Sequence, residues 1–436
     1  MYEELSINRM INDLKEDMRD FSDQRVGKNK QYQMEDAGMA AFSVFFTQCA
    51  SFLEHQRTIK RKKGKSNLER LFMLKDIPSD NQIRNLLDPV DPEQIEASYQ
   101  RIFLSFEKTN LLDKFRSFDG RILIAVDGTD YYSSTKIYCK KCSQRTLKNG
   151  EINYRHSVIT PVIVQAENER VISLEPEFIV PQDGQEKQDC EINASKRWLE
   201  KHGSFYAKRR AIILGDDLYS HQPYCQKLID KGFHFILVCK PDSHDMLYKT
   251  IDFLAANDVL NTKTVRLWNG KYGEIYTYRY ANKVPLRGDK AALDVNWCEV
   301  TIVREDTGKQ LYRNSFITSF TLSDTNVETI VRDGRARWKI ENENNNVLKQ
   351  RGYHLEHNFG HGSNYLSSLL LSLNILAFLF HTILDMVDER YRAIRAELVK
   401  RTTFFKDLEA LLRYFSFDSW DQVLSFMFTQ LEINSS

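Results

Sequence analysis

Two short apolar runs, each followed by an aspartate, constrain the fold of this chain more than any other feature. Residues 122–126 lead into Asp127, and residues 211–214 lead through a glycine into Asp216 and Asp217. Short runs rich in isoleucine, leucine and valine are typical of buried strands. In an open α/β sheet, active sites collect where the strands end. We therefore expect these carboxylates to meet at one edge of a sheet.

The whole chain has 436 residues, which is too long for a single hydrophobic core. Strands expected at 157–164, 170–174 and 234–239 and helices expected at 189–202 and 221–232 give an α/β order. Residues 245–313 alternate between apolar and polar side chains, which indicates a β-rich insertion. We predict a helical N-terminal region (1–118), which the cluster of lysines and arginines at residues 57–65 suggests is DNA-binding, a catalytic core that carries the acidic residues (119–244 and 314–362), the insertion (245–313) and a helical C-terminal region (363–436).

A third acidic residue is expected from the helix that follows the insertion. Glu341 lies four residues after Arg337 and eight before Lys349, so the three side chains share one polar stripe. Asparagine is a mediocre helix former, so a run of asparagines here indicates a face used for hydrogen bonding, including to DNA. These residues are Asn342, Asn344, Asn345 and Asn346.

One carboxylate from each of two strands and a third from a helix can hold two Mg²⁺ or Mn²⁺ ions. These ions prefer hard oxygen ligands, and a pair of them neutralises charge on the attacking and leaving oxygens of a phosphodiester. We predict that Asp127, Asp216 and Glu341 are the metal-binding catalytic residues. Asp217 and Glu343 are rivals for the second and third positions.

Three motifs resemble those of the DDE transposases of bacterial insertion sequences. They are Asp127-Gly-Thr129, Gly215-Asp216 with a following Tyr219, and Arg337-Trp-Lys-Ile-Glu341 with a later Lys349. The resemblance is to the cut-and-paste group with a Tyr-Arg-Glu-Lys signature, and it covers about residues 121–361. Gly334 stands where the signature tyrosine would fall.

This resemblance implies an RNase H-like core interrupted by a β-strand insertion. It implies cleavage at the inverted repeats of a transposon end, strand transfer into target DNA, and an assembly that is at least dimeric. It also implies that Arg337 and Lys349 contact DNA phosphates, and Trp338 is a further DNA-binding candidate. The alternatives are an inactive or domesticated DNA-binding regulator and an RNase H-like nuclease.

Basic and aromatic residues outside the core supply further candidates for DNA contact. A basic run between residues 57 and 65 is either a solvated loop or an arm that binds DNA phosphates. Its central residues are Lys60, Arg61, Lys62 and Lys63. A C-terminal basic patch is a solvated face, a DNA-end surface or a dimer surface; it contains Arg390, Arg392, Arg395, Lys400 and Arg401. In the insertion, Trp268 and Trp297 are candidates for stacking on bases.

A Cys-x-x-Cys pair suggests a structural zinc ion. Cys139 and Cys142 have the spacing of a zinc knuckle, and His156 and Cys190 would complete a tetrahedral set. His361 lies between two glycines, and we expect it to contact the DNA backbone or to make structural hydrogen bonds.

The chain carries seven cysteines, an odd and sparse set, and no secretory leader is visible. The most apolar run, residues 365–384, contains polar residues and is expected to form a buried helix. We therefore expect a cytoplasmic protein with no membrane contact, and the resemblance to insertion-sequence transposases implies that it is bacterial and nucleoid-associated.

Overall fold

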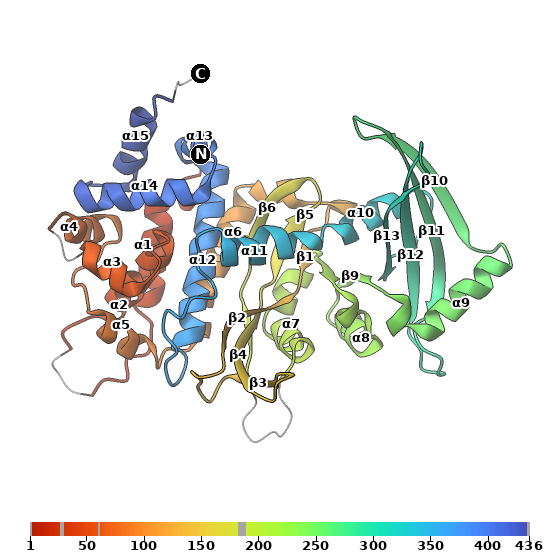
Figure 1. Cartoon of the computed structure of the whole chain (residues 1–436), viewed down its shortest axis with the longest axis horizontal. Helices are drawn as coiled ribbons and strands as arrows, with labels where there is room; N and C mark the ends of the chain where they lie inside the picture. Colours follow the sequence, from red (N-terminus) through yellow and green to blue (C-terminus); the bar gives the residue numbers. More distant parts are fainter. Residues whose placement is uncertain (1, 27–29, 60–61, 182–188, 434–436) are drawn as a thin grey trace.

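The computed structural model describes residues 2–26, 30–59, 62–181 and 189–433 (Figure 1). A helical body lies at one end, a mixed sheet crosses the middle, and long strands of the same sheet form the other end. The architecture is mixed α/β, as predicted.

Within the described ranges, the larger sheet has nine strands in the order β10-β11-β12-β13-β9-β8-β1-β5-β6. Its centre is parallel, because β8 pairs in parallel with both β1 and β9. The strands of this half are β1 (Leu123–Ala125), β5 (Val162–Gln165), β6 (Asn168–Ser173), β8 (Ile212–Gly215) and β9 (His234–Val238). Their side chains are largely buried, as expected for strands covered on both faces.

The insertion continues this sheet. Its strands are β10 (Asn261–Trp268), β11 (Gly273–Pro285), β12 (Asp294–Arg304) and β13 (Gln310–Thr318), and α9 (Asp245–Ala256) precedes them. β13 pairs with the core strand β9 through Phe316 opposite Val238. The boundary expected at residue 313 therefore falls inside a strand that the insertion and the core share.

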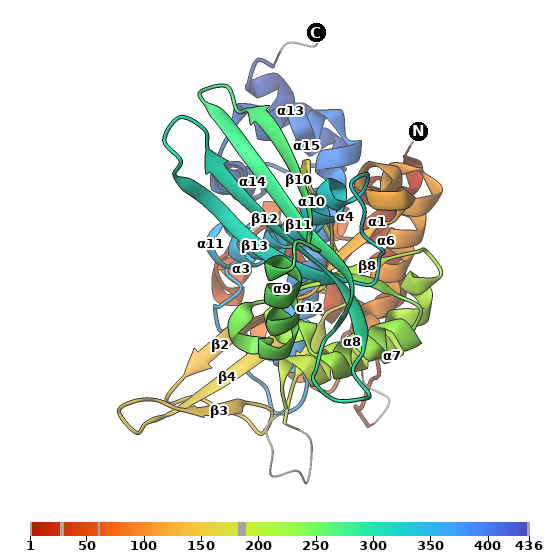
Figure 2. The same ribbon diagram turned by 90° about the vertical axis from the view of Figure 1, so that its right-hand side faces the viewer.

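The strand expected at 157–164 is two strands in two sheets. β4 (Ile152–Ile159) ends before Thr160-Pro161, and β5 begins after it; proline cannot donate a ladder hydrogen bond, which favours a break here. β4 belongs to a smaller sheet with β2 (Gly128–Ser134), β3 (Ser143–Thr146) and β7 (Glu177–Ile179). Figure 2 shows β2, β3 and β4 projecting from the body of the molecule.

The helix expected after the insertion is broken into three pieces. α10 (Val327–Arg335) is followed by a π-helical turn, Ile340–Asn345, and then by α11 (Asn346–Gln350). Two helices flank the parallel strands, α7 (Glu191–Ala207) and α8 (Gln222–Asp230). The π-helical turn contacts β5 and β6, which places its residues over the sheet.

The two ends of the chain form a single helical body (Figure 1). Its N-terminal helices are α1 (Ile7–Met18), α2 (Met34–Phe46), α3 (Phe52–Ile59), α4 (Lys62–Leu71), α5 (Asp80–Leu87) and α6 (Glu96–Lys108). Its C-terminal helices are α12 (Leu366–Val387), α13 (Glu389–Glu397), α14 (Arg401–Tyr414) and α15 (Trp420–Gln430). Asn67 on α4 donates to the carbonyl oxygens of Leu412 and Phe415 at 2.8 Å each, which ties the two ends together.

In the part of the chain that the structure describes, α12 is the one helix long and apolar enough to cross a membrane. It is a core helix, because 89% of its most apolar window is buried. It packs on α2, α13 and β6. This burial confirms the prediction for residues 365–384 and is consistent with a soluble protein.

Candidate active site and metal cluster

The two aspartates that follow buried strands lie at the same edge of the sheet. β1 and β8 are parallel neighbours, with Ala125 opposite Leu214, and the Val126 N–H donates to the Leu214 carbonyl at 2.9 Å. Asp127 and Asp216 therefore leave adjacent strands in the same direction. Parallel pairing produces this convergence directly from the two apolar runs.

Asp127 lies in a partly buried cluster of carboxylates. Burial and the nearby carboxylates of Glu191, Glu341 and Asp216 together raise the pKa of Asp127 to about 7, against the opposing charge of Arg337. The ionised form is disfavoured because desolvation and like charges both act against it. The structure thus brings Asp127, Asp216 and Glu341 together.

The rival acidic residues face elsewhere. Asp217 accepts a hydrogen bond from the Lys240 N–H at 2.6 Å and one from the Ser243 hydroxyl, so it holds the loop after β9. Glu343 lines a separate cavity together with Arg351. In contrast, Asp216 acts electrostatically on both Asp127 and Glu191. This arrangement favours Asp216 and Glu341 as the partners of Asp127.

A fourth carboxylate, which the sequence reasoning did not identify, belongs to the same cluster. Glu191 begins α7, and its Oε1 accepts hydrogen bonds from the Gly128 N–H at 3.0 Å and the Tyr219 hydroxyl at 2.6 Å. Burial raises its pKa, and Asp216 adds to this shift. A carboxylate at the start of a helix looks like an ordinary N-terminal charge in a sequence, so no local signal marked it.

The π-helical turn carries Glu341, whose half-exposed carboxylate is close enough to Asp127 to raise its pKa. Two of its asparagines are buried: Asn345 accepts from the Thr160 hydroxyl at 2.9 Å, and Asn344 donates to Asn345 at 2.9 Å. The expectation that the asparagine run presents a face to DNA is therefore wrong for these two residues. They anchor the turn to the loop between β4 and β5, while Asn342 remains exposed.

The residues expected to contact DNA differ in their surroundings. Arg337 donates to Glu341 at 2.6 Å and is largely buried, whereas Trp338 beside it is 44% exposed. Lys349 is half-buried and forms an ion pair with Glu356 at 3.1 Å. Of the two insertion tryptophans, Trp268 is 70% exposed, but Trp297 is fully buried in β12 and cannot stack on bases.

The basic run of residues 57–65 lies partly outside the described residues, which exclude Lys60, Arg61 and the side chain of Lys62. Lys63 donates to the Tyr414 carbonyl at 2.6 Å and lies 5.8 Å from the centre of the Phe415 ring. In this structure Lys63 therefore joins α4 to the end of α14.

Two cysteines and two histidines form a compact cluster at the base of the projecting sheet. The ligand atoms of Cys139, Cys142, His156 and His361 all lie within 4.8 Å of one another. The two sulfurs are 3.9 Å apart, Cys142 Sγ lies 3.5 Å from His156 Nε2, and it lies 3.4 Å from His361 Nε2. Tetrahedral Zn²⁺ with bonds of about 2.3 Å would separate two sulfurs by about 3.8 Å. This Cys₂His₂ cluster could hold a metal ion such as zinc.

The cluster corrects two predictions. Cys190 is exposed at the start of α7 and is not part of the cluster. Its expected place is taken by His361 from the loop before α12, a histidine that we expected to contact the DNA backbone or make structural hydrogen bonds and not to join this cluster. His361 lies 219 positions from Cys142 in the chain, and the fold alone brings them together. The glycines on either side of His361 are the one sequence signal that this histidine sits in a tight loop.

No protein-family model matches the chain, and no curated protein matches it.

Proposed function

We propose that this protein is a DNA transposase whose catalytic residues are Asp127, Asp216 and Glu341. One observation carries the proposal. Carboxylates from two parallel strand ends and from the turn after the insertion gather in one partly buried cluster, where Asp127 has a pKa of about 7. Such a concentration of like charge is unfavourable unless cations neutralise it. The motifs that resemble DDE transposases contribute these same residues.

The donor set fits two hard divalent ions such as Mg²⁺ or Mn²⁺. Asp127, Asp216 and Glu341 would hold them, because their carboxylate oxygens are the ligands that these ions prefer. When bound, the ions would neutralise charge on the attacking and leaving oxygens of a phosphodiester.

The chain's own residues then bind and orient the DNA. Arg337 holds Glu341 by an ion pair, and a guanidinium has further N–H donors that can reach a phosphate. Glu191 fixes the backbone immediately after Asp127 through the Gly128 N–H, so we assign it a positioning role. Water would attack at the transposon end, and the freed 3′ hydroxyl would attack target DNA in the same site. The partner is double-stranded DNA, bound by at least a dimer so that two ends are brought together.

We also propose that Cys139, Cys142, His156 and His361 bind a structural Zn²⁺. The support is their mutual spacing; the hydrogen bond between the two thiols lowers the pKa of Cys139 and raises that of Cys142, so Cys139 is the more readily ionised of the pair. A thiolate is the form that binds zinc. The ion would fasten the projecting sheet to the loop before α12.

The test of the proposed function is cleavage of a DNA fragment that carries the inverted repeats flanking the gene, with Mg²⁺ or Mn²⁺ present. Asp127→Asn, Asp216→Asn and Glu341→Gln should each reduce cleavage by about a thousandfold or more while DNA binding is retained. Asp217→Asn is the matched control for Asp216→Asn, because the same change is made at the next residue, and it should cut like the wild type.

The products distinguish the alternatives. Cleavage followed by joining of the 3′ ends to target DNA supports a transposase. Cleavage of any DNA without joining would indicate a nuclease, and end-specific binding with no cleavage would indicate a DNA-binding regulator. Equal activity of Asp127→Asn and the wild type would contradict the proposed site.

A further inference from the structure

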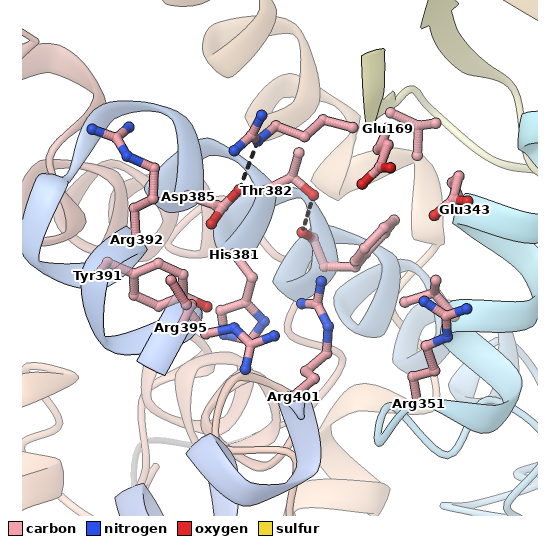
Figure 3. Close-up of a pocket in the computed structure, with 15 residues that line it drawn as sticks. Glu169, Glu343, Arg351, His381, Thr382, Asp385, Tyr391, Arg392, Arg395 and Arg401 are labelled. Atoms are coloured by element: carbon pink, nitrogen blue, oxygen red, sulfur yellow. Dashed lines mark hydrogen bonds and ion pairs between the residues drawn. The ribbon is translucent and has the colours of Figure 1, made fainter. Parts of the chain in front are cut away.

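A cavity of about 330 Å³ lies between the helical body and the end of the sheet. Figure 3 shows its lining, which comes from β6, the π-helical turn with α11, and the three helices α12, α13 and α14. This volume is within the range of small-ligand sites. The cavity is separate from the carboxylate cluster, because Glu343 faces the cavity whereas Glu341 faces Asp127.

Arginines dominate the charge of the cavity. Its charged lining consists of Arg170, Arg351, Arg392, Arg395 and Arg401, with the acids Glu169, Glu343 and Asp385. Arg170 is neutralised by Asp385 at 2.6 Å. Across the described residues, the other four arginines form no ion pair with a carboxylate. The cavity therefore has an excess of positive charge.

Three polar atoms of residues that line the cavity are buried and have no hydrogen-bond partner among the described residues. They are Arg395 Nη1 and the hydroxyl of Tyr391, both from α13, and His381 Nε2 from α12. A buried polar group without a partner is costly, and a buried guanidinium is more so. These atoms are therefore the ones a bound ligand would satisfy.

Arg395 and Arg401 come from different helices and lie near each other at the wall of the cavity (Figure 3). Burial lowers the pKa of Arg395, and the charge of Arg401 lowers it further. Arg401 is held in place by its donation to the Tyr353 hydroxyl at 2.9 Å. The neutral His381 beside them adds no further positive charge, because burial holds its pKa well below the ordinary range.

We propose that this cavity binds a phosphate group. Several forked guanidinium donors around one space match the oxygens of a phosphate, which can accept from all of them at once. The apolar walls formed by Val171, Val347 and Phe378 leave room for an organic group attached to the phosphate. The phosphate could belong to a free nucleotide or to a DNA backbone; both present the same chemistry to the arginines.

The test is thermal unfolding of the full chain during titration with inorganic phosphate, with sodium chloride at matched ionic strength as the reference. The wild type should show a saturable rise in Tm. Arg395→Gln should weaken phosphate binding by about tenfold or more, since it removes a charge-assisted donor. Without phosphate, this variant should be about as stable as the wild type, because it removes a partly buried charge that forms no ion pair but also gives up the contact of the Arg395 guanidinium with the Phe404 ring, 5.6 Å from its centre. The matched control is Lys406→Gln, which removes a positive charge from an exposed position on α14 and should leave binding unchanged.

Arg401→Gln should also lose phosphate binding, although it gives up a hydrogen bond to Tyr353 and is expected to be less stable. Two competitors identify the source of the phosphate. If deoxyadenosine monophosphate binds more strongly than inorganic phosphate, the natural ligand is a nucleotide. If a short DNA duplex displaces inorganic phosphate from the wild type, and binds more weakly to Arg395→Gln, the natural ligand is a DNA backbone. A wild type that responds to phosphate no more than to chloride would overturn the proposal, as would an Arg395→Gln variant that responds like the wild type. The readout needs no cleavage activity, so a failure here is distinguishable from a failure of the transposase proposal.

Discussion

At the scale of single residues, Asp127 sits where the fold opposes its ionisation. Its carboxyl is partly buried and lies among the carboxylates of Glu191, Glu341 and Asp216. The folded state therefore retains a proton on Asp127 up to a pH of about 7, whereas the unfolded chain releases it near the ordinary value of 3.8. A site of this kind gives up stability at neutral pH in order to present negative charge to cations.

This arrangement predicts a pH-dependent stability difference for Asp127→Asn in metal-free solution. At pH 3 both states of the wild type are protonated, and the substitution should have little effect. Between pH 4 and 7 the unfolded wild type binds fewer protons than the folded one, so its stability falls as the pH rises. Above pH 7 the variant should be more stable by on the order of 2–4 kcal/mol.

Denaturant unfolding at a series of pH values measures this difference. Asp252→Asn, on the exposed face of α9, is the control and should follow the wild type at every pH. Mg²⁺ should stabilise the wild type above pH 7 but have little effect on Asp127→Asn. If the free energies of unfolding of Asp127→Asn and the wild type differ by the same amount at every pH, the pKa of Asp127 is not raised in the folded state.

The sequence predicted some residues of the carboxylate cluster and of the Cys₂His₂ cluster but not others, and the difference has a physical reason. Asp127 and Asp216 could be predicted from the sequence because an apolar run followed by an acidic residue is a local pattern. Glu191 and His361 were not, because each enters its cluster through packing between segments far apart in the chain. Cys190 had suitable chemistry, but it is the exposed N-cap residue that precedes α7 and lies outside the cluster.

At the scale of elements, the Cys₂His₂ cluster joins the projecting sheet to the loop before α12. Cys139 and Cys142 lie in the β2–β3 connection, His156 lies on β4, and His361 comes from the loop. A bound metal would replace the packing that a small sheet cannot supply by itself.

Metal analysis of purified protein should find one zinc per chain in the wild type and much less in Cys142→Ser and His361→Ala. Each of these variants should also lose Tm, because metal binding contributes folding free energy. Cys190→Ser is the matched control and should keep its zinc. If His361→Ala keeps its zinc and Cys190→Ser loses it, the fourth ligand is Cys190, as expected from the sequence, and not His361.

Element-level prediction was most accurate where periodicity decides the structure. The buried strands β1, β8 and β9 and the core helix α12 follow from apolar patterning. Apolar periodicity could not predict the π-helical turn, because it is stabilised by the buried hydrogen bonds that Asn345 accepts from Thr160 and Asn344, and local helix preference does not favour it. The continuation of the insertion into the core sheet depends on the pairing of β13 with β9, which no local pattern encodes.

At the scale of the whole molecule, the N-terminal and C-terminal regions behave as one structural unit instead of two. Trp420 on α15 is fully buried and donates from Nε1 to the Leu71 carbonyl at 2.9 Å. Its ring contacts Phe46 and Phe72 at centroid distances of 5.0 and 5.4 Å. The last helix thus completes a core that the first hundred residues begin.

We therefore predict that Trp420→Ala loosens both ends of the chain together. The substitution removes a large buried ring and leaves the Leu71 carbonyl without its partner, so the free energy of unfolding should fall by about 3–5 kcal/mol. Hydrogen exchange should accelerate in α4 and α15 alike, while β12 keeps its protection. Trp268→Ala is the matched control, because that tryptophan is 70% exposed and its removal should change stability little. Faster exchange confined to α15 would show that the C-terminal helices fold independently of the N-terminal ones.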